Sequence, residues 1–330
     1  MTKGIVERLL EGPVLGDGGY ILELEKRGYV QAGPFTPEVT IEHPYAVAEL
    51  HREFLRAGVD VLQTMTFYAS DDKLATVGLG SRVDEINRNA VQIARGVAAE
   101  GDALVAGNLS LTWVYDPSDP ATSDRVRALF DRQLQAQMDA GGVDMWIGET
   151  FAYLGEALLF VERAKATNIP VMATMCFEQQ APRSYEGDPP AECARRLAAG
   201  GADIVGVNCL NAPEQQLPIA IEMRGAVPGV YVAAQPVAFR TTADQPDFTA
   251  TDHFPYTLDP LQLSRHEMAD FARDAVDAGV NYVGSCCGSV QSHVRAMAKV
   301  MGKVPTAERE WRTDRVMSAY EYREHDETEV

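Results

Sequence analysis

The stretch PYAVAELHREFLRAGVDVLQTMTF, residues 44–67, joins two patterns that together indicate the fold. Its first part repeats apolar residues at a helical period and ends on Gly58, a residue that favours a helix stop. Its second part, VDVLQTMTF, begins almost wholly apolar, as expected of a strand that is buried on both faces. A helix that leads directly into a buried strand is typical of an α/β unit with a parallel sheet.

The same strand pattern recurs along the chain, and helical patterns such as HEMADFARDAVDAGV separate the runs. Eight strands that alternate with helices predict an α/β fold, the (β/α)₈ TIM barrel. An open doubly wound sheet is the alternative, and it fits less well because no GxGxxG follows the first strand. The eight runs are residues 13–19, 59–67, 103–111, 143–151, 169–177, 202–210, 230–238 and 280–288.

The barrel is predicted to take up residues 1–305 as one domain, because no shift in composition marks a second one. Residues 306–330 lie past the eighth unit, and we expect them to form a C-terminal arm or a tail. The polar, Pro-rich segment 240–262 falls between the seventh strand and its helix. This position predicts a lid over the barrel mouth.

Composition excludes several classes of partner. The 330 residues carry 48 acidic and 29 basic side chains, a net charge of −19, which repels nucleic acid and anionic membranes. No apolar run is long enough to cross a bilayer and no signal-peptide pattern opens the chain, so we expect a cytoplasmic protein. The sequence leaves open whether the protein forms a homo-oligomer. The histidines His43, His51 and His293 lie at or in helical stretches and are interpreted as surface residues.

Three of the five cysteines stand at predicted strand ends. Cys209 ends the sixth run, and Cys286 with Cys287 ends the eighth. In a barrel these ends meet at the C-terminal rim, where active sites are built. Three thiolates at one rim suit Zn²⁺, a tetrahedral metal whose fourth position would stay open for substrate. Gly284 and Gly288 would supply the backbone freedom that a sharp turn at adjacent cysteines needs.

The five cysteines also allow other interpretations. Buried free cysteine is a common small core residue, which accounts for Cys176 and Cys193. A hypothesis of another class is a thiol redox or metal-sensing protein that uses Cys286 and Cys287, because adjacent cysteines form strained, easily reduced disulfides.

The motifs GVNC and GSCCG, which contain these three cysteines, resemble the zinc-binding signatures of the homocysteine S-methyltransferase family. The resemblance extends over roughly residues 12 to 300, and its motifs fall in order at the predicted strand ends. It implies a (β/α)₈ barrel in which Cys209, Cys286 and Cys287 hold zinc. The stretches most similar to the betaine–homocysteine methyltransferase branch are residues 16–38, 50–74, 100–107 and 172–176.

This resemblance implies transfer of a methyl group from a betaine-type onium donor to homocysteine, giving methionine and the demethylated donor. Glycine betaine is the leading donor; proline betaine, dimethylsulfoniopropionate and S-methylmethionine are alternatives with the same chemistry. A metal favours the thiolate form of homocysteine, which is the nucleophile. A third hypothesis, a non-catalytic binder of homocysteine or betaine, would not need a thiolate-activating metal.

The resemblance also assigns polar residues. Asp17, in GDGG, is expected to face the ammonium group of homocysteine, and the amides of Gly18 and Gly19 its carboxylate region. The alternative is that Asp17 only caps a turn. Glu149 matches a family glutamate that contacts the substrates, and we assign it a catalytic role. A carboxylate after the apolar run VDMWIG is costly to bury unless it is paired, which itself suggests a site. The alternative is a glutamate at the rim that is solvated by water.

Aromatic residues are predicted to line the donor pocket. Tyr68, in TFYAS, matches a tyrosine of the betaine branch and is also assigned a catalytic role, with Phe67 and Phe35 in the same cage. Aromatic faces attract trimethylammonium groups through cation–π interactions. The alternative for each of these rings is plain core packing. Phe35 replaces the branch's usual Trp, whereas Thr150 and Phe239 replace its usual Tyr. Three such changes around one pocket predict a wider or less electron-rich cage.

Overall fold

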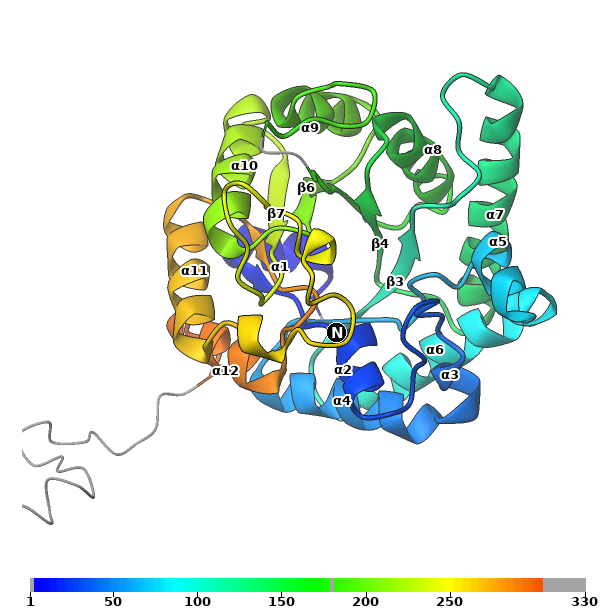
Figure 1. The fold of residues 1–330 in the computed structure, drawn as a ribbon, viewed down its shortest axis with the longest axis horizontal. Helices are drawn as coiled ribbons and strands as arrows, with labels where there is room; N and C mark the ends of the chain where they lie inside the picture. Colours follow the sequence, from blue (N-terminus) through cyan, green and yellow to red (C-terminus); the bar gives the residue numbers. More distant parts are fainter. Residues whose placement is uncertain (1–2, 179–180, 305–330) are drawn as a thin grey trace, which may run out of the picture.

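The computed structural model describes residues 3–178 and 181–304, and its central feature is one sheet of eight parallel strands (Figure 1). The predicted arm or tail, residues 306–330, lies outside the described residues. The strands pair in the order β1-β8-β7-β6-β5-β4-β3-β2. They are β1 Val14–Leu15, β2 Val61–Gln63, β3 Leu104–Ser110, β4 Met145–Phe151, β5 Val171–Met175, β6 Ile204–Asn208, β7 Tyr231–Gln235 and β8 Tyr282–Val283.

The two ends of this sheet meet. The amide of Asp60 donates to the carbonyl of Leu15 at 2.8 Å, and the amide of Leu15 donates to the Asp60 carboxylate at 2.8 Å. These bonds join β1 to the residue before β2 and bring the sheet around into a barrel. The predicted (β/α)₈ fold is therefore confirmed, and each predicted strand run contains one of the eight strands.

Helices surround the barrel (Figure 1). Gly58 ends α4 in the left-handed conformation, with φ at 105°, as the sequence predicted. The pattern VDEINRNAVQIARGVAAEG likewise predicts a helix that ends at Gly101, and this prediction was wrong, because α6 stops at Ala98. The helices are α1 Ile5–Glu11, α2 Ile21–Lys26, α3 Val39–Glu42, α4 Pro44–Ala57, α5 Asp71–Leu74, α6 Val83–Ala98, α7 Pro120–Asp139, α8 Leu154–Lys165, α9 Pro190–Ala199, α10 Pro213–Ala226, α11 Arg265–Asp277 and α12 Gln291–Val300.

The barrel interior changes from apolar to polar along the strands. One apolar cluster takes residues from all eight strands, including Met145 and Ile147, together with Ile5 and Leu9 of α1. Because these residues start the strands, α1 closes the N-terminal end of the barrel. Side chains alternate along a strand, so the residue two after Ile147 also points inward, and it is Glu149. The same spacing places other buried polar residues in this layer: Gln63, Asn108, Thr174, Asn208 and Gln235.

Two predictions about single residues were wrong. His51 is fully buried and His293 is 4% exposed, so neither is a surface residue. Each ring takes part in hydrogen bonding: His51 Nδ1 lies 2.9 Å from the Tyr20 hydroxyl, and His293 Nε2 lies 2.8 Å from the carbonyl of Leu263. A helical residue whose ring meets a partner from another element cannot be recognised from the helix alone.

No helix in the described ranges is long and apolar enough to span a membrane.

Candidate active site

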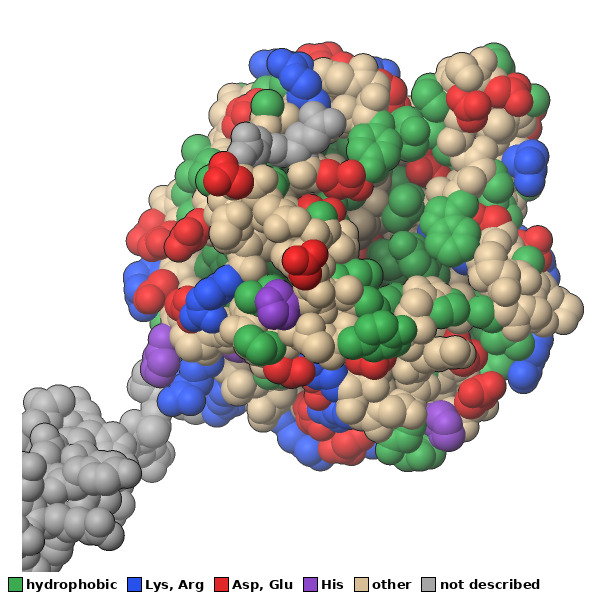
Figure 2. All heavy atoms as spheres, in the orientation of Figure 1, with side chains coloured by type: hydrophobic (Ala, Val, Ile, Leu, Met, Phe, Trp, Pro, Cys, Tyr) green, Lys and Arg blue, Asp and Glu red, His purple; other side chains and the backbone are tan. Residues whose placement is uncertain are grey.

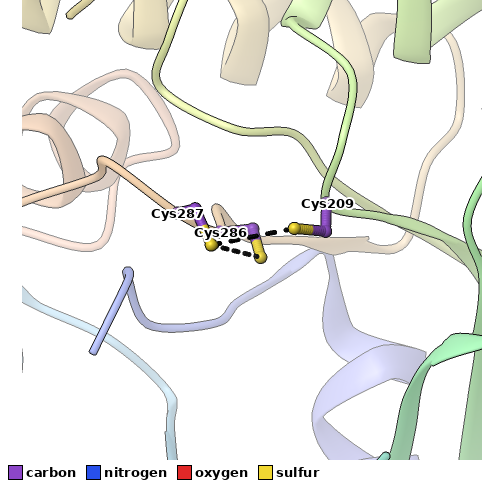
Figure 3. Close-up of side chains that lie close together, drawn as sticks. All are labelled: Cys209, Cys286 and Cys287. Carbon is purple, nitrogen blue, oxygen red and sulfur yellow. Dashed lines mark hydrogen bonds between the residues drawn. The ribbon is translucent and has the colours of Figure 1, made fainter. Parts of the chain in front are cut away.

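The side chains of Cys209, Cys286 and Cys287 converge at the C-terminal end of the barrel (Figure 3). Cys209 directly follows β6, and the adjacent pair follows β8. The sulfur of Cys287 lies 3.7 Å from that of Cys209 and 4.0 Å from that of Cys286, and all three sulfurs lie within 4.8 Å of one another. The sequence prediction that the three cysteines share one place is confirmed, as is the burial of Cys176 and Cys193 in the core.

This spacing fits a tetrahedral thiolate metal site. Sulfur ligands at about 2.3 Å from zinc, in tetrahedral geometry, lie about 3.8 Å apart. Three thiolates this close repel one another strongly unless a cation lies among them. Within the described residues, no other group of His, Cys, Asp and Glu side chains meets in this way. The residues present therefore fit a zinc ion.

The neighbouring backbone holds the sulfurs in place. The amide of Cys209 donates to the carbonyl of Gln235 at 2.9 Å, and that of Cys286 donates to Pro236 at 2.8 Å. The end of β7 thus joins the two cysteine loops. Gly288 has φ at 79°, as its predicted role in the turn requires. The role predicted for Gly284 was wrong: its φ is not positive, and a Cβ there would lie 2.9 Å from the Gln235 side chain.

The three cysteines line a pocket that opens at this end of the barrel. Its empty space is about 940 Å³, a volume that includes the part open to solvent. Figure 2 shows a hollow near the middle of this face with hydrophobic side chains inside it. All the residues that were predicted from the sequence to bind substrate line this pocket. They are Asp17, Gly18, Gly19, Phe35, Phe67, Tyr68 and Glu149.

Asp17 is buried beside the pocket, 3% exposed. Its Oδ2 accepts hydrogen bonds from the Tyr20 hydroxyl at 2.5 Å and from the Gln63 amide at 2.7 Å. Burial raises the pKa of Asp17 to about 7, and these two hydrogen bonds act in the opposite direction. Among the two glycines that follow, the amide of Gly19 already donates to the Ser289 carbonyl at 3.2 Å.

Glu149 is the centre of a network of side-chain amides. Its Oε1 accepts from Gln63 Nε2 at 2.7 Å and from Asn108 Nδ2 at 2.6 Å, and its Oε2 accepts from Asn208 Nδ2 at 3.1 Å. Burial raises the pKa of Glu149 to about 7, whereas the bonds from Asn108 and Gln63 lower it. All three partners are donors, so the arrangement suits an ionised carboxylate. Glu149 is not a solvated rim residue.

Aromatic rings make up another part of the wall. Phe67 stacks on Tyr68 with ring centroids 4.3 Å apart, and Phe35 lies 6.2 Å from Phe254. The prediction that Phe239 borders this pocket was wrong, because it lies fully buried outside the lining and stacks on Phe248, which does line the pocket.

Backbone strain gathers at the pocket. Six residues other than glycine have positive φ in the described ranges, and five of them line the pocket: Phe35, Tyr68, Thr150, Cys209 and Leu210. Each such conformation costs of order 1 kcal/mol and persists only where the surroundings enforce it. Thr150, at φ 62°, falls where the pairing of β4 with β5 shifts register. The strain therefore marks the part of the structure that is shaped for a ligand.

Several lining residues were missed by the sequence reasoning. Phe248, Thr249 and Phe254 come from segment 240–262, which lies at the pocket where the lid was predicted; its opening stays a prediction. The carbonyl oxygens of the Gln63 and Gln235 side chains are buried without a hydrogen-bond partner in the described part of the chain. Each of the two glutamines follows an interior apolar residue by two positions. This strand period was the signal from which their place inside the barrel could have been predicted.

The fold and the pocket together define a barrel enzyme that carries three thiols at its active-site end. The sequence pattern of a family described as homocysteine S-methyltransferase matches residues 14–301. Betaine–homocysteine S-methyltransferase 1 of Mus musculus is 44% identical over 307 residues, which cover 90% of this chain and 74% of the mouse protein. The protein of the same name from Danio rerio is 45% identical, covering 90% of this chain and 75% of its own.

A relative that is named for a different methyl donor is almost as similar. The S-methylmethionine–homocysteine S-methyltransferase BHMT2 of Pongo abelii is 41% identical and covers 90% of this chain and 81% of its own. A crystal structure of the homocysteine methyltransferase MmuM from Escherichia coli, metallated form, matches the fold with a TM-score of 0.71 at 20% identity, over 89% of this chain and 99% of that chain. The chain belongs to the homocysteine S-methyltransferase family.

Proposed function

We propose that the protein transfers a methyl group from a small onium donor, glycine betaine first among the candidates, to the sulfur of homocysteine. The products are methionine and the demethylated donor. The observation that carries this proposal is one pocket that holds three convergent thiols, two buried carboxylates and a wall of aromatic rings. The family to which the chain belongs supports the acceptor, and the relatives named above support the two kinds of donor.

In this proposal Cys209, Cys286 and Cys287 hold zinc. The ion, when bound, favours deprotonation of the homocysteine thiol and leaves the sulfur nucleophilic. The chain's own contribution is to keep the three sulfurs converging, through the hydrogen bonds that Cys209 and Cys286 make to the end of β7. Cys209 also has a strained backbone, with φ at 57°, which turns its side chain toward the other two.

The polar end of the pocket binds the amino-acid part of homocysteine. Asp17 offers a buried carboxylate to the ammonium group, and the unpaired side-chain oxygen of Gln63 lies at the same wall. The Gly19 amide already donates to the carbonyl of Ser289. Of the two glycine amides, that of Gly18 is therefore the one that binds the substrate carboxylate. The Glu149 carboxylate, held by three amides, contacts both substrates and keeps a negative charge near the donor's cation.

The aromatic end binds the donor. Phe35, Phe67 and Tyr68, together with Phe248 and Phe254 of segment 240–262, enclose this side of the pocket. The rings attract an onium group and exclude water, which places the methyl carbon for in-line attack. The donor's leaving group departs as a neutral amine or thioether, so no residue needs to protonate it.

A donor panel tests this function. Zinc-loaded enzyme is incubated with homocysteine and one of glycine betaine, proline betaine, dimethylsulfoniopropionate or S-methylmethionine, and methionine is measured. We expect methionine with at least one donor and fastest with glycine betaine, and about one zinc per chain. Failure with every donor by a zinc-loaded sample would remove the proposal. Thiol titration with and without a chelator tests the redox hypothesis, which gains if all cysteines react and no zinc is released.

A further inference from the structure

A fully buried lysine lies behind the pocket wall and has no role in the chemistry described so far. Lys73 of α5 has no exposed surface, which is rare for a lysine. Its ammonium donates a hydrogen bond to the carbonyl of Leu111 and lies 3.9 Å from the ring centroid of Tyr68 and 5.4 Å from that of Trp113. Lys73 thus occupies a face of Tyr68, so this face is not available to the onium group of a donor.

Two acidic neighbours hold the same loop. Asp72 Oδ2 accepts from the amide of Trp113 at 2.7 Å, and Glu156 Oε1 accepts from the amide and the hydroxyl of Thr112, both at 2.6 Å. Lys73 bonds to the carbonyl of Leu111, the residue before Thr112. The three ionisable side chains thus fix the three consecutive residues 111–113, which follow β3. Burial lowers the pKa of Lys73 to about 7, and the charges of Asp72 and Glu156 raise it. These carboxylates favour the ammonium form.

Tyr68 needs such support because its backbone is strained. Its φ of 62° is unfavourable for a residue with a side chain, and its ring forms part of the pocket wall. The Tyr68 hydroxyl bonds to no group in the described part of the chain, so the ring is held by what packs on it. Phe67 stacks on the ring, and Trp113 meets it edge-on at 5.6 Å. The ammonium of Lys73 is the charged contact in this set.

We propose that Lys73 is a positioning residue for the methyl donor, whose ammonium keeps the Tyr68 ring in its place in the pocket wall. The inference rests on the proposed function, because it assumes that Tyr68 lies at the donor end. Homocysteine binds at the other end, beside Asp17, which has no contact with Lys73. Loss of the ammonium therefore weakens donor binding and leaves homocysteine binding unchanged.

The test separates the two substrates. Zinc-loaded wild type, Lys73→Met and Lys73→Gln are assayed below neutral pH, and KM is measured for glycine betaine and for homocysteine. We expect the KM for betaine to rise about tenfold in both variants, with the KM for homocysteine and the zinc content within about twofold of wild type. Lys73→Gln keeps a donor for the Leu111 carbonyl without the charge, so it separates the hydrogen bond from the cation–π contact.

Control variants decide between positioning and general damage. Lys165→Met removes a lysine paired with Asp203 at 2.8 Å, near the start of β5, and is expected to leave both KM values unchanged. In a Tyr68→Leu background, Lys73→Met is expected to add nothing to the KM for betaine. An unchanged betaine KM in folded Lys73→Gln, or equal rises for both substrates, would overturn the inference alone. A wild-type enzyme that forms no methionine and binds no donor would remove the proposed function as well.

Discussion

The charge of Glu149 depends on two opposing effects. Burial disfavours the carboxylate, whereas the amides of Gln63, Asn108 and Asn208 all donate to it and favour it. The net result is a pKa of about 7, raised from 4.5. Because the folded protein holds this proton more tightly than the unfolded chain, folding stability falls as pH rises from about 4.5 to about 7. Asp17 acts in the same direction, since its pKa is also raised to about 7.

Glu149→Gln tests this residue-scale effect. Glutamine cannot ionise. Between pH 4.5 and 7 we therefore expect the free energy of unfolding of metal-free Glu149→Gln to fall less than that of metal-free wild type, by up to about 3 kcal/mol. Asp17 still titrates in the variant, so some pH dependence stays. Urea unfolding at both pH values gives the comparison. Equal pH dependence in the two proteins would show that Glu149 has an ordinary pKa.

At this scale the sequence indicated the reactive side chains but not their partners. The three cysteines could be placed because each stands at the end of a recognisable apolar run. Asn108 and Asn208 were not proposed, although Asn108 follows the interior residue Ala106 by two positions. Their partner Glu149 comes from another strand, which the sequence does not show. The error over Phe239 has the same origin: the sequence places it after β7, but packing against Phe248 turns it away from the pocket.

At the scale of elements, the turn that carries Cys286 and Cys287 is packed against the loop after β1. A Cβ added to Gly19 would lie 2.8 Å from the carbonyl oxygen of Cys286 and 3.3 Å from the Cα of Cys287. Real Cβ atoms do not come so near to backbone, so any larger residue at this position must displace the turn. Gly19 is thus needed for space beside the cysteines.

We expect Gly19→Ala to lower the free energy of unfolding by about 1–3 kcal/mol and to speed the loss of zinc to a chelator. The matched control is Gly96→Ala, because Gly96 lies in α6 with nothing within 4 Å of an added Cβ. That change should stabilise the helix by up to about 1 kcal/mol and leave zinc loss unchanged. If zinc leaves both variants at the same rate, the turn tolerates the added methyl group and the packing argument is wrong.

Elements with a clear period were predictable, and short ones were not. The pattern of α4 gave both its range and its stop at Gly58, since apolar positions and glycine agreed. For α6 the same reasoning overshot to Gly101, because the helix ends with Ala99 as its cap and needs no left-handed residue there. The seven residues of α1 are too few to show a period, so its role in closing the barrel came only from the structure.

The whole molecule separates stability from chemistry along the barrel axis. The N-terminal end is closed by Ile5 and Leu9 of α1, which pack on apolar residues of all the strands. The C-terminal end carries the polar layer, the three thiols and the strained residues. This division is usual in (β/α)₈ barrels, where the loops after the strands hold the active site.

Leu9→Ala tests the separation. Leu9 is 5% exposed, so its truncation is expected to lower the free energy of unfolding by about 2–4 kcal/mol. Both KM values should stay within about twofold of wild type, because the cavity forms at the opposite end of the barrel. Leu10→Ala is the control, since Leu10 is 75% exposed and should change stability by less than about 0.5 kcal/mol. A large change in KM for Leu9→Ala would contradict the division.

The fold as a whole was the most predictable level, because eight repeats of one pattern leave few alternatives. Each strand run was found, and the strand ends identified one rim for the cysteines. The closure of β1 on β2 could not be foreseen, since it depends on two hydrogen bonds that the amide and the carboxylate of Asp60 make to the backbone of Leu15. The pocket wall from segment 240–262 was foreseen only as a lid, without its residues.

In the proposed active site, Cys209, Cys286 and Cys287 bind one metal ion and leave one position for the substrate sulfur. X-ray absorption at the zinc edge of the loaded enzyme, without and then with homocysteine, measures this arrangement. We expect about three sulfur neighbours at about 2.3 Å without substrate, and one more when homocysteine is added. A zinc environment with no sulfur, or one that homocysteine does not change, would show that these cysteines do not form the metal site.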